Sequence, residues 1–183
     1  SFGATSATDR ALGSLGSGST VSRFAVAFVN TTGATLNQFT LGYTGEQWRR
    51  GSAPANKLSF SYATGATNLN VGTFTAATAL DFTAPNTTGS GVTLDGNLAA
   101  NRVVIAPVTL TGLTWAAGQT LILRWTDVDD AGSDDGLGID DLTFTAVPAL
   151  TGQPVAQTIT SGGTATFTVA TAATPATYQW RKN

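Results

Sequence analysis

The chain contains no histidine, no cysteine and no methionine among its 183 residues. Without histidine there is no Ser-His-Asp triad, no imidazole metal ligand and no imidazole pH switch. Without cysteine there are no disulfides, thiolate zinc sites or iron–sulfur clusters. A chain without oxidisable sulfur suits life outside the cell, so the composition itself points toward an extracellular location.

Charge is scarce as well. Asp, Glu, Lys and Arg make up 11% of the residues, and the net charge is −2. A weakly acidic chain lacks the basic footprint of a nucleic-acid-binding protein and the basic face of a membrane-surface helix. No stretch approaches the roughly 18 apolar residues that cross a bilayer. We therefore expect no nucleic-acid partner and no insertion into a membrane.

The pattern that dominates the chain is an alternation of apolar and polar residues with a period of two, typical of half-buried strands. It predicts strands over residues 21–30, 57–63, 79–83, 103–115 and 119–126, and a further one that carries Leu142 and Phe144. Pro107 marks an edge position or a bulge in its strand. Short strands separated by turn clusters predict an all-β chain, with a jelly-roll-like β-sandwich over residues 1–147.

The composition changes near residue 147, where a second unit begins. Residues 148–183 contain the stretches QPVAQTIT, GGTATFTV and TYQWRKN. They resemble the opening strands of a bacterial immunoglobulin-like repeat. The resemblance implies a disulfide-free repeat, with Trp180 as the core tryptophan and Phe167 where relatives place their first cysteine. Because such a sandwich takes about 100 residues, we expect a partial domain whose open edges are covered by a neighbour or by further chain.

Residues 1–147 carry a second set of characteristic stretches, DRALGSLGSGST, YTGEQWRRG, LDFTAPNTTG, LDGNLAANR and LILRWTDVDDAGSDDGLGIDDLTF. Together they resemble a jelly-roll module of secreted bacterial multidomain proteins, which precedes immunoglobulin-like repeats or other surface domains. Relatives carry an early strand before the first stretch that is missing here. The resemblance implies an extracellular or cell-surface location and no catalytic role, and it names no ligand.

An acidic cluster is the strongest chemical signal in the chain. Seven of the 11 acidic residues fall within it: Asp127, Asp129, Asp130, Asp134, Asp135, Asp140 and Asp141. These carboxylates repel one another unless a cation or an arginine compensates. Hard oxygen ligands suit Ca²⁺, so the cluster predicts calcium between the strand ending at Thr126 and the strand starting near Leu137. A solvated turn loop and pairing with arginines are the alternatives. An EF-hand is excluded, because Gly138 stands where its final Glu belongs.

Candidates for catalysis and ligand binding are few. The single glutamate, Glu46, has two arginines nearby, which favours an ion pair over the proton-donor role in glycoside hydrolysis. Aromatic rings can stack on a sugar. Trp125 alternates with Leu121 and Leu123, which predicts a place in the core. Trp48 has polar neighbours on both sides and is the predicted ligand-binding side chain.

These observations predict a non-catalytic extracellular module that mediates adhesion, glycan contact or spacing in a larger secreted or cell-surface protein, stabilised by calcium. Its partners would be a glycan or neighbouring surface subunits. The alternative is a structural building block of a surface filament or layer. Such a homo-polymer would assemble through strand donation or edge pairing.

Overall fold

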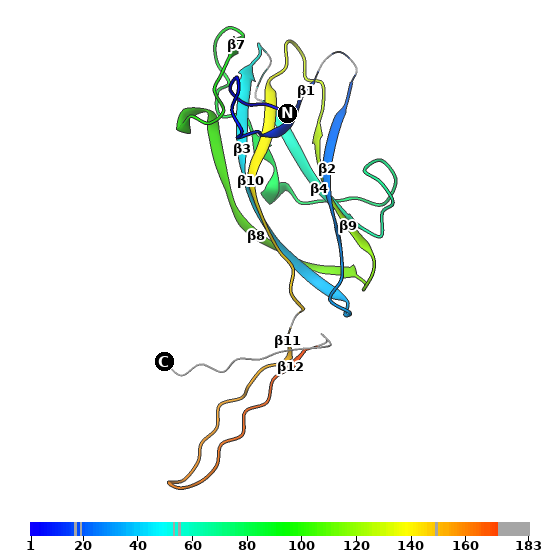
Figure 1. Ribbon diagram of the computed structural model, residues 1–183, viewed down its shortest axis with the longest axis vertical. Helices are drawn as coiled ribbons and strands as arrows, with labels where there is room; N and C mark the ends of the chain where they lie inside the picture. Colours follow the sequence, from blue (N-terminus) through cyan, green and yellow to red (C-terminus); the bar gives the residue numbers. More distant parts are fainter. Residues whose placement is uncertain (17, 19, 53, 55, 149, 172–183) are drawn as a thin grey trace.

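The computed structural model describes residues 1–16, 18, 20–52, 54, 56–148 and 150–171. Within residues 1–148, two antiparallel sheets pack face to face (Figure 1). The first sheet contains β1 (Leu12–Leu15), β10 (Gly136–Thr145), β3 (Leu36–Arg50), β8 (Arg102–Trp115) and β7 (Val92–Thr93). The second contains β2 (Ser22–Val29), β9 (Thr120–Asp127), β4 (Lys57–Thr64), β5 (Thr75–Ala76) and β6 (Phe82–Thr83). Two 3-10 turns, η1 (Thr78–Leu80) and η2 (Ala99–Asn101), lie in the connections.

The order of the strands is that of a jelly roll. In the first sheet β1 pairs with β10, β10 with β3, and β3 with β8. In the second sheet β2 pairs with β9, β9 with β4, and β4 with both β5 and β6. The chain thus passes between the sheets from β1 to β4 and returns between them from β8 to β10, as in a double-sheet jelly roll. The predicted all-β sandwich is confirmed.

The hydrophobic core lies between the two sheets. Leu121, Leu123 and Trp125 of β9 are fully buried there, as their alternation predicts. Tyr43 of β3 faces them, its ring 5.4 Å from that of Trp125 in an edge-on arrangement, and its hydroxyl donates to the carbonyl oxygen of Leu80 at 2.5 Å. The prediction that Trp125 belongs to the core is confirmed, so this ring is not available to a ligand.

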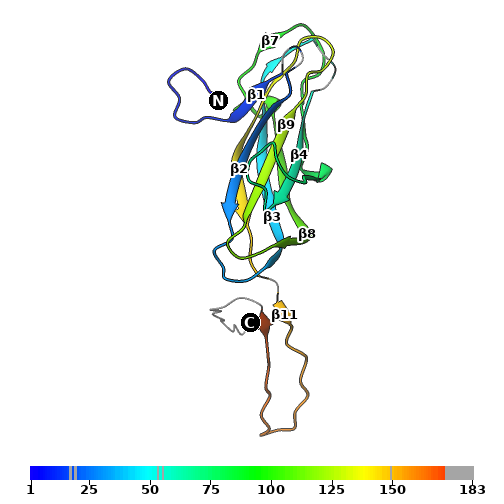
Figure 2. The same ribbon diagram turned by 90° about the vertical axis from the view of Figure 1, so that its right-hand side faces the viewer.

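Strand β3 is buried on both faces over a longer run than the other strands of the sandwich. Residues 41–48 are buried without interruption. Their inner face contacts the core, and on the outer face Trp48 is covered by the ring of Phe2 and by Gly96 in the loop after β7. The backbone N–H of Phe2 donates to the carbonyl oxygen of Ala11 at 2.9 Å, which closes a loop that projects from the sandwich (Figure 2). The outward side chains of β3 that lie under these segments are therefore shielded from solvent.

Two strand predictions have different outcomes. The predicted strand over residues 79–83 is wrong in its first half, where the backbone N–H of Leu80 donates to Ala77 O at 2.9 Å in η1, and only β6 is extended. The predicted irregularity at Pro107 is confirmed. The register of β3 and β8 shifts between the pairs Leu41–Val108 and Tyr43–Ile105.

The C-terminal unit is described up to residue 171. In it β11 (Leu150–Gly152) pairs with β12 (Ala170–Thr171), and the connection between them includes a turn at residues 161–162. Trp180, the predicted core residue of the immunoglobulin-like repeat, lies outside the described residues. The partial immunoglobulin-like sandwich over residues 148–183 and the domain boundary at residue 147 therefore stay predictions.

Candidate functional site

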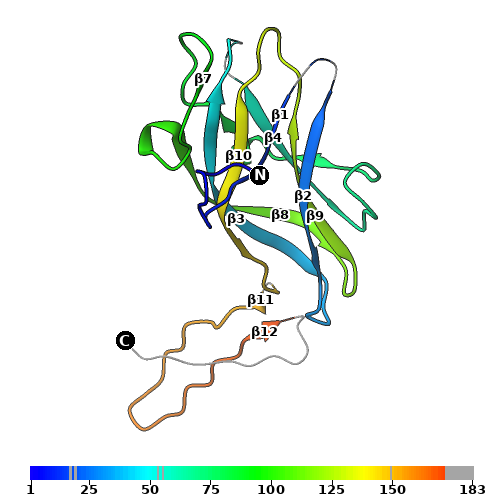
Figure 3. The same ribbon diagram turned by 45° about the horizontal axis from the view of Figure 1, so that its top comes forward.

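The acidic loop between β9 and β10 lies at one end of the sandwich, beside the connection between β3 and β4 (Figure 3). The backbone N–H of Ser52 donates to Ser133 O at 2.8 Å, and that of Ser133 donates to Ser52 Oγ at 3.2 Å. Gly51 is required at this contact, because a side chain on it would overlap the Ser133 carbonyl. The two connections are thereby held together through their backbones.

Asp135 is a structural acceptor at the base of this loop. It is 2% exposed, and its carboxylate accepts hydrogen bonds from the Gly51 backbone N–H at 2.6 Å and from Gln47 Nε2 at 2.9 Å. Burial raises the pKa of this carboxyl, whereas the two donors and the charge of Arg49 lower it. The carboxylate thus fixes the start of β10 to the end of β3.

Asp127, Asp130 and Asp134 form the acidic group of the loop. Asp127, 1% exposed, accepts a hydrogen bond from Ser14 Oγ at 2.8 Å. Asp134, 4% exposed, accepts one from the Asp130 backbone N–H at 3.0 Å, and Asn56 Nδ2 donates to both Asp130 and Asp134. Burial raises the pKa of Asp127, and the charges of Asp134 and Asp130 raise it further. Asp129 is exposed beside this group.

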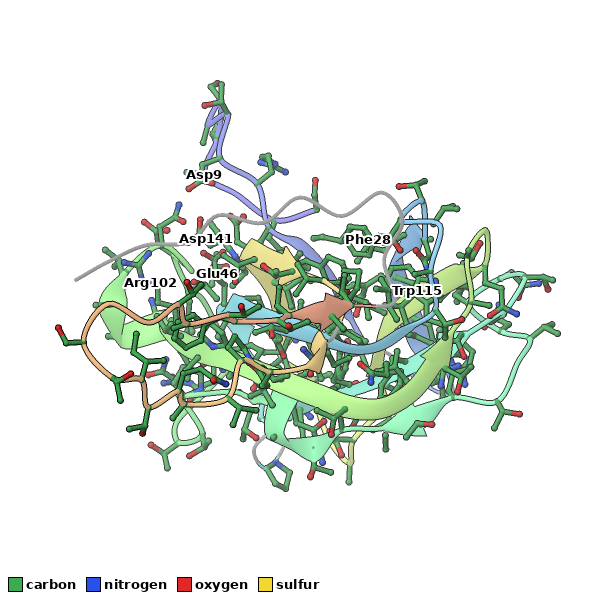
Figure 4. All side chains as sticks on the ribbon, turned by 90° about the horizontal axis from the view of Figure 1, so that it is seen from below. Asp9, Phe28, Glu46, Arg102, Trp115 and Asp141 are labelled. Carbon is green, nitrogen blue, oxygen red and sulfur yellow. The ribbon has the colours of Figure 1, made fainter. Side chains whose placement is uncertain are left out.

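Asp140 and Asp141 do not belong to the loop. They lie further along β10, and with Asp9 and Glu46 they form a second acidic group on the outer face of the first sheet (Figure 4). Burial raises the pKa of Asp140; the Asp141 backbone N–H lowers it, and the charges of Asp9 and Asp141 raise it. The seven aspartates predicted as candidate metal ligands therefore do not form one cluster in space, and which of them bind metal stays a prediction.

Arginine does not neutralise either group within the described residues. The ion pair found among these residues joins Lys57 Nζ to Asp81 Oδ2 at 3.0 Å, away from both groups. Arg49 instead donates to the Asp134 backbone oxygen and, at 2.6 Å, to Ser133 Oγ. The alternative of arginine pairing is therefore met in part: the Arg49 guanidinium donates to a carbonyl and a hydroxyl, forms no ion pair among these residues, and acts on the cluster through its charge near Asp135.

Glu46 also has a different partner from the one predicted. Its Oε2 accepts a hydrogen bond from Trp48 Nε1 at 2.8 Å, and it forms no ion pair within the described residues. Burial raises the pKa of Glu46, the Trp48 donor lowers it, and the neighbouring aspartates raise it. The expected ion pair with a nearby arginine is wrong, because the Glu46 carboxylate instead accepts the hydrogen bond of the Trp48 indole.

A metal ligand set is not preformed in the described part of the chain. No three acidic side chains there are placed as ligands of one ion. The residue types still suit calcium, because Asp130, Asp134 and Asn56 form one hydrogen-bonded network of oxygen-bearing side chains, and Asp127 lies close enough to feel the charges of the two aspartates. Binding one ion would require these side chains to turn toward it.

A polar pocket of about 380 Å³ opens beside the loop. Its lining residues are Leu15, Gly16, Gly18, Arg49, Gly132, Ser133 and Asp134. Sequence reasoning did not find this pocket. The available signal was the glycine-rich stretch at residues 13–18 together with Gly132, since residues without side chains leave open space between connections.

Trp48 does not form an exposed platform. It is 8% exposed, and the ring of Phe2 stacks on it with centroids 6.3 Å apart and planes 7° from parallel. On another side a Cβ at Gly96 would overlap the indole. The prediction that polar neighbours leave this ring open to a ligand is corrected, because residues distant in the sequence cover it.

Comparison with protein-family models, curated proteins and solved structures finds no match for this chain. Among the described residues, no helix has the length and apolar character needed to cross a membrane. The functional inference therefore depends on the groups described above.

Proposed function

We propose that this chain is a non-catalytic module of a larger secreted or cell-surface protein, stabilised by calcium, and that it serves in glycan contact, adhesion or spacing. The proposal of calcium rests on the group formed by Asp127, Asp130 and Asp134. Two of these carboxylates are almost completely buried, and no arginine or lysine forms an ion pair with them among the described residues. Buried like charges need protons or a cation, and calcium would supply the counter-charge at neutral pH.

The non-catalytic part is supported by the lack of histidine and by the surroundings of Glu46. The chain has no histidine, and the only glutamate is held by an indole N–H in the outer face of the sheet. A general acid or base needs an open approach for substrate within hydrogen-bonding distance. Glu46, 2% exposed, has no such approach while Phe2 and Trp48 remain in place.

A thermal melt with and without calcium tests the proposal. Removing divalent ions with EDTA should lower the melting temperature, and adding Ca²⁺ should restore it, because a ligand that binds only the native state stabilises it by about 2.7 kcal/mol at a hundredfold excess over Kd. Magnesium at the same concentration is the ionic control. Identical melting curves in EDTA, in Ca²⁺ and in Mg²⁺, with metal removal verified by atomic absorption, would rule out the calcium site.

The building-block function is a second candidate, supported by one edge of the first sheet. Strand β8 spans 14 residues and, within the described part of the chain, pairs only with β3. Arg102 is its only charged residue, and Val104 is 72% exposed. Natural sheets usually protect such edges with charges, so an almost uncharged edge favours pairing with another strand.

Size-exclusion chromatography with light scattering, followed by electron microscopy, tests this second candidate. Regular polymers that disappear in Val104→Lys but persist in Val71→Lys would support edge pairing through β8. Val71 is a suitable control because it is also exposed and lies outside β8. A monomer at all concentrations, without filaments, would remove the building-block function.

A further inference from the structure

The ring of Phe2 lies in a seat of matching shape on the outer face of the first sheet. Gly136 and Gly138 of β10 form its floor: a Cβ on Gly136 would lie 3.2 Å from Phe2 Cζ, and one on Gly138 would lie 3.4 Å from Phe2 Cδ2. Trp48 of β3 forms one wall through parallel stacking with Phe2. We call this site, made by Gly136, Gly138 and Trp48, the Phe2 seat. Larger residues in place of either glycine would fill it.

Hydrogen-bond acceptors stand next to this apolar floor. Glu46 is the direct cross-strand neighbour of Gly138, and its carboxylate is oriented by Trp48 Nε1. Asp140 follows Gly138 by two residues on the same strand, so both point to the same face. Asp9 and Asp141 lie near these carboxylates (Figure 4). The Phe2 seat therefore combines a flat apolar surface with a rim of carboxylates.

Few contacts hold Phe2 in the seat. Its backbone N–H donates to Ala11 O at 2.9 Å, and Arg10 donates to Ser1 O at 3.0 Å. Residues 4–6 and 8–10 are exposed, and the loop projects from the sandwich (Figure 2). Asp9 and Asp140 form a side-chain hydrogen bond that needs one shared proton, and their like charges repel when both are ionised. Phe2 can therefore leave the seat without breaking any hydrogen bond of the sheet ladders.

We propose that the Phe2 seat is the carbohydrate-binding site of this module, and that a neutral pyranose ring takes the place of Phe2. The proposal rests on the glycan-contact function proposed above and identifies its site and its regulation. A pyranose presents a flat C–H face that stacks on an indole, and its hydroxyls donate to carboxylates. Among the described residues, four carboxylates outnumber the one arginine at the rim, Arg102 opposite Glu46, and this net negative charge favours neutral sugars over uronic and sialic acids.

Phe2 acts in this arrangement as an internal competitor. When only a fraction of molecules is open, the apparent Kd equals the intrinsic Kd divided by that fraction. Removing the Phe2 ring makes the seat permanently open and raises the apparent affinity by the inverse of the open fraction. A molecule that is open about one-tenth of the time gains about tenfold in affinity.

The experiment measures binding of neutral hexasaccharides (cellohexaose, maltohexaose, laminarihexaose and hexa-N-acetylchitohexaose) to the whole chain by calorimetry and by ¹H–¹⁵N spectra of the tryptophan indoles. Hexagalacturonate is the acidic control. Phe2→Ala removes the competitor, and Phe2→Tyr keeps a ring of nearly the same size. Phe74→Ala is the matched control, because Phe74 packs on the second sheet. Phe2 is only partly buried at the loop end, so its replacement leaves the core intact.

The expected result is at least one neutral hexasaccharide that binds Phe2→Ala about tenfold more tightly than wild type, Phe2→Tyr and Phe74→Ala. The Trp48 indole signal, assigned from the spectrum of Trp48→Phe or by backbone-linked assignment, should shift on binding. Equal binding by wild type and Phe2→Ala, without that shift, would overturn the Phe2 seat and leave glycan contact standing. Absence of binding to every neutral hexasaccharide in both proteins would overturn the seat and the glycan function together.

Discussion

Replacing Asp127 with asparagine should change stability in opposite directions without and with calcium. Asp127 is buried and accepts a hydrogen bond from Ser14 Oγ, and the charges of Asp130 and Asp134 are close enough to raise its pKa. Asparagine has the same shape, and it satisfies both partners of the carboxylate when its Oδ1 accepts from the Gly16 backbone N–H and its Nδ2 donates to Ser14 Oγ. The substitution therefore removes one charge and little else.

The size of the effect without calcium follows from two opposing contributions. Two unit charges about 4 Å apart repel by about 1 kcal/mol in water and by more at lower dielectric, so two acidic neighbours contribute about 2 kcal/mol. Replacing a charged acceptor with a neutral one weakens a hydrogen bond by about 1 kcal/mol. The variant should thus be more stable by about 1 kcal/mol, a rise of about 2–4 °C for a chain of this length.

With calcium the order should reverse. Wild type gains about 2.7 kcal/mol at a hundredfold excess over Kd, equivalent to about 5–11 °C, whereas the variant has lost a carboxylate ligand. Differential scanning calorimetry in EDTA and in Ca²⁺ measures the difference in melting temperature between variant and wild type under both conditions. Asp95→Asn is the charge-matched control, because Asp95 is exposed in a different turn. A variant that is less stable in EDTA, or that gains as much from calcium as wild type, would refute the reasoning.

The pH dependence of the melting temperature tests the same reasoning independently. Burial and neighbouring charges raise the pKa of Asp127 above its ordinary value of 3.8. The folded state therefore binds this proton more tightly than the unfolded state, and the resulting stability is full below pH 3.8 and lost as the pH rises through the raised value. In EDTA the wild-type melting temperature should fall from about pH 4 toward neutrality, less steeply in Asp127→Asn. A rise over that interval would contradict the direction of the shift.

Three further predictions concern other parts of the chain. Gly45→Ala should destabilise the protein by about 1–3 kcal/mol in urea unfolding, because the new methyl group would overlap the Phe82 ring in the core; unchanged unfolding would show that the sheets separate there. Glu46→Gln should leave any catalytic turnover of the parent protein intact, since an amide oxygen still accepts from Trp48; loss of turnover by orders of magnitude in a folded variant would mean a catalytic role. The isolated peptide 148–183 should give a random-coil circular dichroism spectrum and solvent-exposed tryptophan emission, and a folded monomer would contradict the partial-domain prediction.

Local patterns predicted the strands that have one buried face and missed the strand that has two. β9 alternates between core and outer side chains, so Leu121, Leu123 and Trp125 were recognisable from the sequence. β3 is covered on both sides, and its buried residues follow one another without a break. The available signal was the spacing of Phe39, Leu41 and Tyr43, which occupy every second position. The polar residues that follow obscure this pattern.

The candidate sites were harder to predict, because each depends on where a strand begins. β10 starts at Gly136, and a strand advances about 3.3 Å per residue. Asp140 therefore lies about 13 Å along the strand from its start and cannot share one small ion site with Asp127. The cover on Trp48 comes from Phe2, which is far away in the sequence. No local pattern contains such a contact.

The two proposals share a strand and are physically connected through it. Asp134 and Asp135 directly precede Gly136, the first residue of β10, and Gly136 forms part of the floor of the Phe2 seat. Asp135 binds the Gly51 N–H beyond the end of β3, and Trp48 on β3 forms the wall of the seat. A cation held by the loop would therefore fix the spacing of floor and wall as well as neutralise the carboxylates. The loop continues into β10 and is hydrogen-bonded beyond the end of β3. One bound ion would therefore neutralise the carboxylates and preorganise the Phe2 seat at the same time.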